Sequence, residues 1–221
     1  MFHHRPFLRT LNWVRVLITF LAGLTAASRA ATLHPGFVES DIGSNWNNPV
    51  GVAFGKNSAG TKDRAYVWER YGNVWIVEDG VKLGSPLLNL SEEVADYGDY
   101  GLLGFALDPD FAQNGYLYAL YVVDRHHLLY YGTAQYNAAT NTRNQATIGR
   151  LTRYTCRRSD DFRSVDPASR LVLIGETISS GIPILHSSHG VGSLVFGTDG
   201  TLLLTCGDGA SYQSMDNGGG A

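Results

Sequence analysis

Apolar and polar side chains alternate with a period of two along much of the chain after Ala31, and this pattern predicts β-strands. RAYVWER (residues 64–70) and NVWIVED (residues 73–79) alternate on either side of Tyr71-Gly72, which is typical of a β-hairpin. A shorter apolar run, PVGVAF (residues 49–54), precedes this pair. We therefore expect an antiparallel sheet in this part of the chain.

Two further strand pairs follow the same plan. YGLLGFALDPDF (residues 100–111) and GYLYALYVVD (residues 115–124) are separated by the turn signal Asn114-Gly115. GSLVFG (residues 192–197) and TLLLTCGD (residues 201–208) are separated by Asp199-Gly200. Each pair predicts a hairpin whose two ends lie at the same edge of its sheet.

The intervening segments are less regular. We expect HHLLYYGTAQY (residues 126–136) to continue the strands, and SEEVADY (residues 91–97) to form at most one helical turn with a serine cap. The polar segment 137–170 predicts a strand pair with a solvated loop insertion. That loop includes Arg157, Arg158, Asp160 and Asp161.

The strand pairs resemble one another, and their similar starts lie near residues 51, 104 and 193. Four-stranded units repeated at intervals of roughly 40–50 residues are typical of a β-propeller. The fold class we predict is all-β, a β-propeller of four-stranded blades. Because the sequence stops at DNGGGA without a closing strand, we expect residues 31–221 to be the N-terminal part of such a domain, incomplete at the C-terminus.

Residues 1–30 have the pattern of a secretory signal peptide. Three arginines precede the apolar run VLITFLAGLTAA (residues 16–27), and Ser28-Arg29-Ala30 offers small residues for cleavage. The alternative is a membrane anchor, but an apolar run of 12 residues is shorter than the roughly 20 that a spanning helix needs. We therefore predict an exported protein, periplasmic or secreted.

Composition and charge narrow the function classes. With 44% hydrophobic and 17% charged residues, the chain is neither disordered nor collagen-like. The first thirty residues hold four arginines and no acid, so the formal net charge falls from −3 for the whole chain to −7 for the remainder. An acidic protein is a poor candidate for binding nucleic acid or anionic membranes. A small neutral substrate is the better expectation.

The two cysteines, Cys156 and Cys206, could form a disulfide in an exported chain. They do not form a CxxC motif for metal or haem. Cys206 ends the apolar run LLLTC, and the simpler interpretation is that both thiols are buried and act as small hydrophobic groups.

The candidate chemistry lies at residues 186–213, at the two ends of the last hairpin. His189 precedes the first strand and Asp208 follows the second, so the turn between the strands brings their side chains to one edge. An imidazole accepts protons near neutral pH, and a carboxylate can fix its tautomer. The alternative is structural, because Gly-Asp-Gly is a good turn and a loop histidine is usually solvated. His186 is a second candidate base, and Gln213 would follow in the same loop.

Other chemistries have weaker support in the sequence. The glycine-rich stretches lack the strand and helix context of a dinucleotide site, and there is no P-loop, HExxH or Gly-x-Ser-x-Gly motif. Asp108-Pro109-Asp110 is a two-acid turn and not a calcium-binding loop.

Two long motifs resemble those of the glucose/sorbosone dehydrogenase family, whose members include soluble quinoprotein glucose dehydrogenases and aldose sugar dehydrogenases. They are GLLGFALDPDFAQNGYLYALYV (residues 101–122) and HGVGSLVFGTDGTLLLTCGDG (residues 189–209), with PVGVAF and WERYGNVWIVEDG ahead of them in the family's order. The resemblance implies a six-bladed β-propeller. It also implies oxidation of an aldose at its anomeric carbon, with pyrroloquinoline quinone (PQQ) as cofactor together with calcium.

The resemblance also implies roles for individual residues. His189 matches the family's general base, and Asp208 matches the acid that orients it. Gln213 falls at a position bordering sugar and quinone, and Asp99 stands where the enzymes have a longer Gln or Glu near the quinone. Ser188 and Ser193 depart from the family's usual Asp and Arg.

The resemblance assigns no metal ligand in this chain, because the family's calcium ligands and quinone-binding arginine lie in later blades. We therefore expect little or no activity from residues 31–221 alone. The electron acceptor would be a periplasmic carrier or a cytochrome, which the sequence does not identify.

Two other functions fit the same scaffold. One is a non-catalytic propeller for protein or carbohydrate binding, as in relatives such as the Hedgehog-interacting protein, but such a module has no reason to keep His189, Asp208 and Gln213 together. The other is a propeller lactonase, which would need a central cluster of metal-binding acids and amides that the sequence does not indicate.

Overall fold

The computed structural model describes residues 32–142 and 144–211. The chain divides into two units, residues 1–40 and residues 41–221. In the first unit the described residues, 32–40, contain a turn at Pro35-Gly36 and neither helix nor strand. The predicted signal peptide and Gln213 lie outside the described residues. The second unit contains all the helices and strands that follow.

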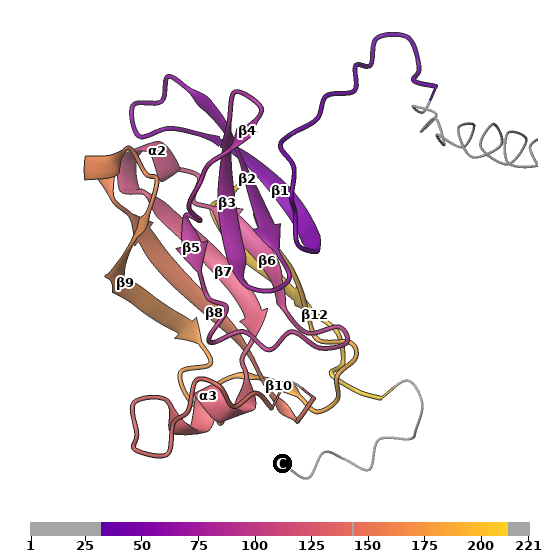
Figure 1. Cartoon of the computed structure of the whole chain (residues 1–221), viewed down its shortest axis with the longest axis vertical. Coiled ribbons are helices and arrows are strands. Elements are labelled where there is room, and N and C mark those ends of the chain that lie inside the picture. The colour runs from indigo at the N-terminus through magenta and orange to yellow at the C-terminus, as the bar shows by residue number, and fades with distance from the viewer. Residues whose placement is uncertain (1–31, 143, 212–221) are drawn as a thin grey trace, which may run out of the picture. The chain divides into compact units, whose positions relative to one another are not determined.

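The first sheet is an antiparallel meander in the order β1-β2-β3-β4, with β5 pairing with β3 (Figure 1). The register of β2 against β3 places Trp68 opposite Val74, so the chain turns at Tyr71-Gly72 as the alternation predicted. The strands are β1 (Pro49–Lys56), β2 (Asp63–Glu69), β3 (Asn73–Glu78), β4 (Val81–Lys82) and β5 (Leu88–Asn89).

The second sheet has β6, β7 and β8 as successive antiparallel neighbours, and both β9 and β10 pair with the outer edge of β8. The third sheet is the hairpin of β11 and β12. The bounds are β6 (Leu102–Leu107), α2 (Phe111–Asn114), β7 (Tyr116–Val122), α3 (Arg125–Tyr130), β8 (Thr147–Cys156), η1 (Arg158–Asp160), β9 (Val165–Ile174), β10 (Ile182–Ile184), β11 (Val191–Phe196) and β12 (Leu202–Cys206).

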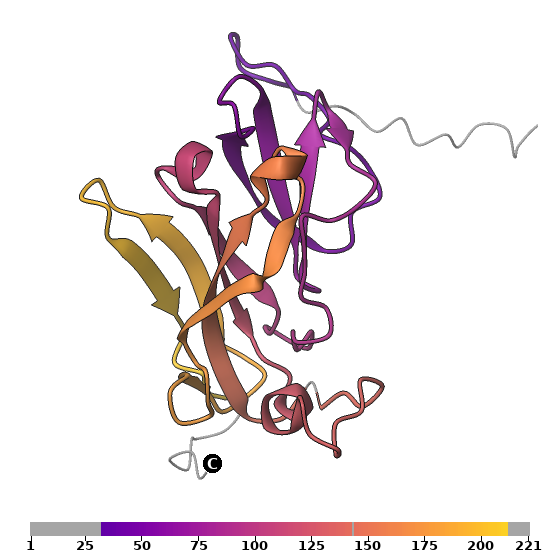
Figure 2. The ribbon, with the colours of Figure 1, turned by 90° about the vertical axis from the view of Figure 1, so that its left-hand side faces the viewer.

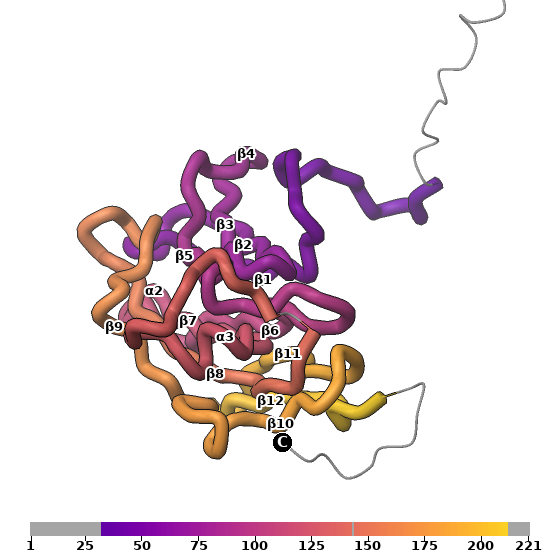
Figure 3. Tube along the Cα trace, turned by 60° about the horizontal axis from the view of Figure 1, so that its bottom comes forward, coloured from indigo at the N-terminus to yellow at the C-terminus, as the bar shows by residue number. Residues whose placement is uncertain are grey.

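The three sheets fan outward as separate layers (Figure 2), and their first strands β1, β6 and β11 lie side by side (Figure 3). Each sheet thus begins with its inner strand and adds strands outward, which is how propeller blades are built. The predicted all-β fold with propeller blades is confirmed.

The hydrophobic core fills both spaces between the three sheets. Alternate residues of β7 face opposite ways: Leu117 and Tyr121 belong to the cluster shared with the first sheet, whereas Leu120 and Val122 belong to the cluster shared with the third. All four side chains are inaccessible to solvent. Burial on both faces explains why the sequence of β7 is almost continuously apolar.

The expectation that residues 126–136 continue the strands is wrong, because this segment begins as helix α3. Asp124 caps the helix, and its side chain accepts the backbone N–H groups of His126 at 2.9 Å and His127 at 3.1 Å. Both edges of β7 are already paired, one with β6 and one with β8. If residues 126–136 were a strand, they would therefore find no free edge of β7 on which to pair.

Two smaller expectations hold only in part. Residues 91–93 form a single turn, in which the N–H of Val94 donates to the Leu90 carbonyl at 2.9 Å, but its cap is Asn89 and not Ser91, whose own N–H donates to Asn89 Oδ1 at 2.9 Å. The loop between β8 and β9 is solvated only in part: Arg157 and Arg158 are exposed, whereas Phe162 is 1% exposed and lies with its ring centroid 5.2 Å from that of Phe111.

Asp161 in the same loop is partly buried and completes an ion cluster with the first sheet. Arg64, whose side chain is fully buried, donates from Nη2 to Asp161 Oδ2 at 2.7 Å and from Nε to Glu78 Oε1 at 2.7 Å. The backbone N–H of Ser58 also donates to Asp161. This cluster holds the loop of the second sheet against the strands of the first.

We predict that Arg64→Met lowers the free energy of unfolding by about 3–5 kcal/mol, because Glu78 and Asp161 lose a buried partner. Urea denaturation of the protein measures this change. The control is Lys56→Met, which removes a 2.7 Å ion pair with Asp63 whose side chains are 52% and 88% exposed. That variant is expected to lose less than about 1 kcal/mol. Equal losses in the two variants would contradict the structural role of the cluster.

Candidate functional site

His189 and Asp208 meet at one end of the β11–β12 hairpin. His189 Nδ1 donates a hydrogen bond to Asp208 Oδ1 across 2.9 Å, and the two side chains are 45% and 69% exposed. The pairing of Val191 with Cys206 brings the start of one strand beside the end of the other. The predicted proximity of the two side chains is confirmed.

The backbone of His189 is held in an uncommon conformation. Its φ angle is 56°, in the left-handed region that few residues other than glycine adopt. Its N–H donates to Asp99 Oδ2 at 3.1 Å, and its carbonyl accepts the N–H of Gly209 at 2.8 Å. Gly207 lies so close that a β-carbon there would be 2.4 Å from the His189 carbonyl oxygen. These contacts fix the direction in which the imidazole leaves the main chain.

The Asp208 carboxylate is positioned to accept a hydrogen bond from the N–H group of an imidazole. The backbone N–H of Ala210 donates to Asp208 Oδ1 at 3.1 Å, and this bond, together with that from His189, lowers the pKa of the carboxyl group below its ordinary value. The carboxylate is therefore ionised at neutral pH. Because it accepts from Nδ1–H, the neutral imidazole has its basic lone pair on Nε2.

Asp99 reaches His189 from the neighbouring sheet, just before β6. Its own N–H donates to the carbonyl of Ser187 at 2.9 Å. The loop that carries it is anchored by Arg70, which donates from Nη1 to the Gly98 carbonyl at 2.7 Å and forms an ion pair with Asp96 at 2.7 Å. Gly98 approaches so closely that a β-carbon there would be 2.3 Å from Ser187 O.

The sequence did not predict that Arg70 anchors the loop of Asp99, or that Ser188 donates a hydrogen bond within the site. Arg70 follows the end of β2, as Asp208 follows the end of β12, but its role depends on a contact between sheets. Ser188 is 3% exposed and donates from Oγ to the Ala210 carbonyl at 2.7 Å. His186 lies beside it, with Nδ1 3.0 Å from Ser188 Oγ. The structure thus brings His189, and not His186, to Asp208.

The pair borders an open depression of about 530 Å³. Cys206 lines this depression and is exposed, so the expectation that its thiol is buried is wrong. The reason is that β12 is an edge strand, with β11 as its one described neighbour. Cys156 is buried as expected, and burial raises its pKa to about 12; both cysteines are free. The lining residues are Asp99, Leu103, His189, Gly190, Val191, Cys206, Gly207 and Asp208.

The chemistry available in this depression is acid–base chemistry. It combines an ionised carboxylate, an oriented imidazole and a second carboxylate, but its lining has no lysine or arginine. Within residues 32–142 and 144–211, no three or more His, Cys, Asp or Glu side chains are grouped to hold a metal ion. The described residues can accept a proton and hydrogen-bond a hydroxyl group, whereas they do not fit a polyanionic cofactor or calcium by themselves.

Comparison with known proteins gives a family match and a fold match. A sequence model of the family described as Glucose / Sorbosone dehydrogenase matches residues 47–220. The soluble aldose sugar dehydrogenase from Escherichia coli in its apo-form is similar in structure, with 21% identity and a TM-score of 0.50 over 77% of this chain and 40% of that one. A crystal structure of a glucose dehydrogenase gives 18% identity and a TM-score of 0.52, over 77% and 41%.

The PQQ-bound form of an aldose sugar dehydrogenase from Streptomyces coelicolor has 20% identity and a TM-score of 0.49, over 80% of this chain and 43% of that one. The chain therefore spans between 40% and 43% of the lengths of these three structures. In the described part of the chain, no helix has the length and apolar character needed to cross a membrane.

We predict that Gly207→Ala disturbs the His189–Asp208 pair, because the added methyl group must displace the His189 backbone. The expected loss of stability is about 1–3 kcal/mol, as for other overpacking substitutions. Nitrogen NMR of the imidazole should show a lower population of the tautomer with hydrogen on Nδ1. Gly84→Ala is the control, since nothing lies within 4 Å of a β-carbon there. An unchanged tautomer population in Gly207→Ala would refute the proposed constraint.

Proposed function

Because this chain belongs to the glucose/sorbosone dehydrogenase family, we propose that it is part of a quinoprotein oxidoreductase that oxidises an aldose at C1. The observation that supports this most directly is the hydrogen bond from His189 to Asp208 at the edge of the open depression. An imidazole oriented by a carboxylate, with solvent access, is suited to act as a general base.

The proposed role of His189 is to accept, on its Nε2 atom, the proton of the sugar's C1 hydroxyl group. Asp208 stabilises the imidazolium that forms, because its carboxylate stays ionised at neutral pH. Loss of that proton together with a hydride from C1 converts the cyclic aldose to a lactone. Asp99 borders the depression from the neighbouring sheet, and we propose that it contributes to the sugar side of the site.

The acceptor of the hydride is proposed to be PQQ with calcium, which the family resemblance implies. The described residues assign no ligand to either group, since the depression lacks cationic side chains and the described chain has no metal-binding cluster. Asp99 and Gln213 stay predictions as residues that bind the substrate or the cofactor, and Gln213 is outside the described residues.

Export and the electron partner are also part of the proposal. The proposed signal peptide, residues 1–30, would direct the protein to the periplasm or the exterior. There, a periplasmic carrier or a cytochrome would reoxidise the cofactor. The substrate is a small sugar, which suits a site with no excess of positive charge.

We predict that His189→Ala lowers sugar-dependent dye reduction by roughly 10²–10⁴-fold in the full-length protein reconstituted with PQQ and calcium. The reason is the loss of the proposed general base. The matched control is His186→Ala, because His186 contacts Ser188 instead of Asp208 and should leave the rate close to that of the wild type.

Near wild-type activity in His189→Ala would overturn the assignment of the base. If no aldose supports dye reduction and PQQ does not bind, the proposal that the protein is a quinoprotein oxidoreductase is wrong. The non-catalytic propeller would then be the better interpretation.

A further inference from the structure

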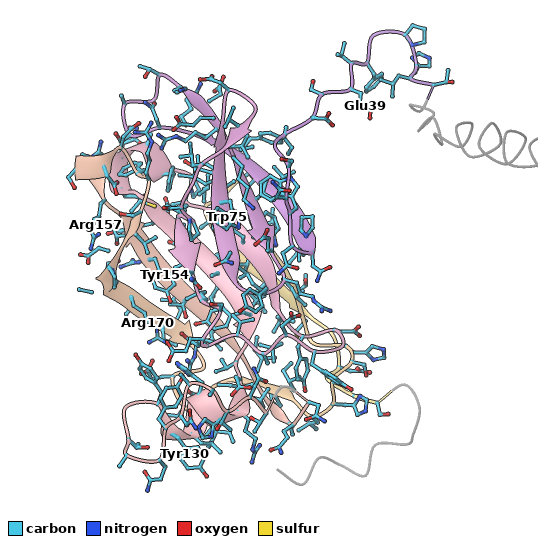
Figure 4. All side chains as sticks on the ribbon, in the orientation of Figure 1. Glu39, Trp75, Tyr130, Tyr154, Arg157 and Arg170 are labelled. Atoms are coloured by element: carbon cyan, nitrogen blue, oxygen red, sulfur yellow. The ribbon has the colours of Figure 1, made fainter. Side chains whose placement is uncertain are left out.

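A second depression, of about 340 Å³, shares no lining residue with the first. It lies among the chain after β5, helix α3 and strands β8 and β9. Figure 4 labels Arg170 on β9 and Tyr130 on α3, two of the elements that border it. The lining residues are Asn89, Leu90, Glu92, Glu93, His127, Leu128, Tyr131, Arg150, Arg170 and Glu176.

The innermost part of this depression is a fixed ion cluster around Glu93, which is 7% exposed. Its Oε1 accepts hydrogen bonds from Arg150 Nη1, from Arg170 Nη2 at 3.0 Å and from the Tyr121 hydroxyl group at 2.6 Å. Burial alone would raise the pKa of Glu93, but Arg170 and Arg150 lower it below the ordinary value. The carboxylate is therefore ionised and holds both guanidinium groups in place.

One wall of the depression is aromatic. The Tyr131 ring stacks on His127, with centroids 4.3 Å apart, and 62% of the tyrosine remains exposed. His127 is 8% exposed, and its Nδ1 has no hydrogen-bond partner among the described residues. Leu90 and Leu128 add apolar surface. Tyr136 also packs against Tyr131, with centroids 5.2 Å apart and the rings at 78°, so this wall presents exposed aromatic surface beside strongly polar groups.

The charges around the depression exclude ionic ligands. An anion would meet the exposed carboxylates of Glu92 and Glu176, while both arginines already contact Glu93. A metal cation would meet those arginines, and the described residues offer no metal-binding group there. A neutral ligand with many hydroxyl groups meets neither obstacle, because each hydroxyl both donates and accepts hydrogen bonds.

We propose that this second depression binds a carbohydrate, at a site separate from the one where oxidation is proposed. The hydroxyl groups of a sugar can donate to Glu92 and Glu176 and accept from Asn89 and Arg170. Its C–H face can pack on the Tyr131 ring, as apolar faces pack on aromatic side chains. A volume of about 340 Å³ is within the range of small-molecule sites. Binding here requires neither PQQ nor the action of His189.

The test is saturation-transfer NMR and calorimetry on the protein without added cofactor, with D-glucose and maltotriose as probes. Tyr131→Ala should weaken binding at least tenfold, whereas Tyr131→Phe should bind like the wild type because it keeps the ring. Tyr71→Ala is the matched control, since Tyr71 is an exposed tyrosine in the β2–β3 turn, outside the lining. His189→Ala should leave this binding unchanged.

The proposal fails if neither sugar binds, or if Tyr131→Ala binds as tightly as the wild type. Binding lost in His189→Ala and kept in Tyr131→Ala would place the sugar at the first depression only, which overturns this proposal and leaves the proposed oxidation intact. Displacement of the sugar by sulfate at millimolar concentration would identify an anion site instead and would also overturn it.

Discussion

The hydrogen bond from the His189 backbone to the Asp99 carboxylate joins two neighbouring sheets at the point where the candidate chemistry lies. A left-handed backbone at a residue with a side chain costs on the order of 1–3 kcal/mol and persists only when its surroundings hold it. Here Asp99 holds the N–H of His189 and Gly209 holds its carbonyl. The imidazole direction is therefore set by the packing of sheets and not by the hairpin alone.

That constraint depends in turn on how tightly the sheets are packed. Strand β7 is buried on both faces, so the second sheet cannot slide relative to the first or the third without exposing apolar surface. Arg70 extends the connection from the end of β2 to the loop that carries Asp99. A chain of contacts thus runs from the first sheet through Asp99 to His189 and Asp208 in the third.

The sequence predicted those features whose causes are local. The hairpins follow from alternation and from turn residues, and the His189–Asp208 contact follows because one hairpin places both residues at the same edge. Features decided by distant residues were missed. Arg64 meets Asp161 across 97 residues, so a polar loop that looked solvated is packed against another sheet. Helix α3 was missed because the sequence of residues 126–136 does not indicate that both edges of β7 are already paired.

Each of the two depressions contains an ionised carboxylate, but the burial of that carboxylate and the groups that pair with it differ. At the first, the carboxylate of Asp208 is exposed and ionised, and its hydrogen-bonded partner is the half-exposed imidazole of His189. At the second, the carboxylate of Glu93 is buried and forms ion pairs with two arginines, Arg150 and Arg170. The first arrangement therefore leaves a histidine and the carboxylate that orients it accessible to a substrate, whereas the second offers a fixed array of donors and acceptors. Proton transfer suits the first arrangement, and recognition of a neutral ligand suits the second.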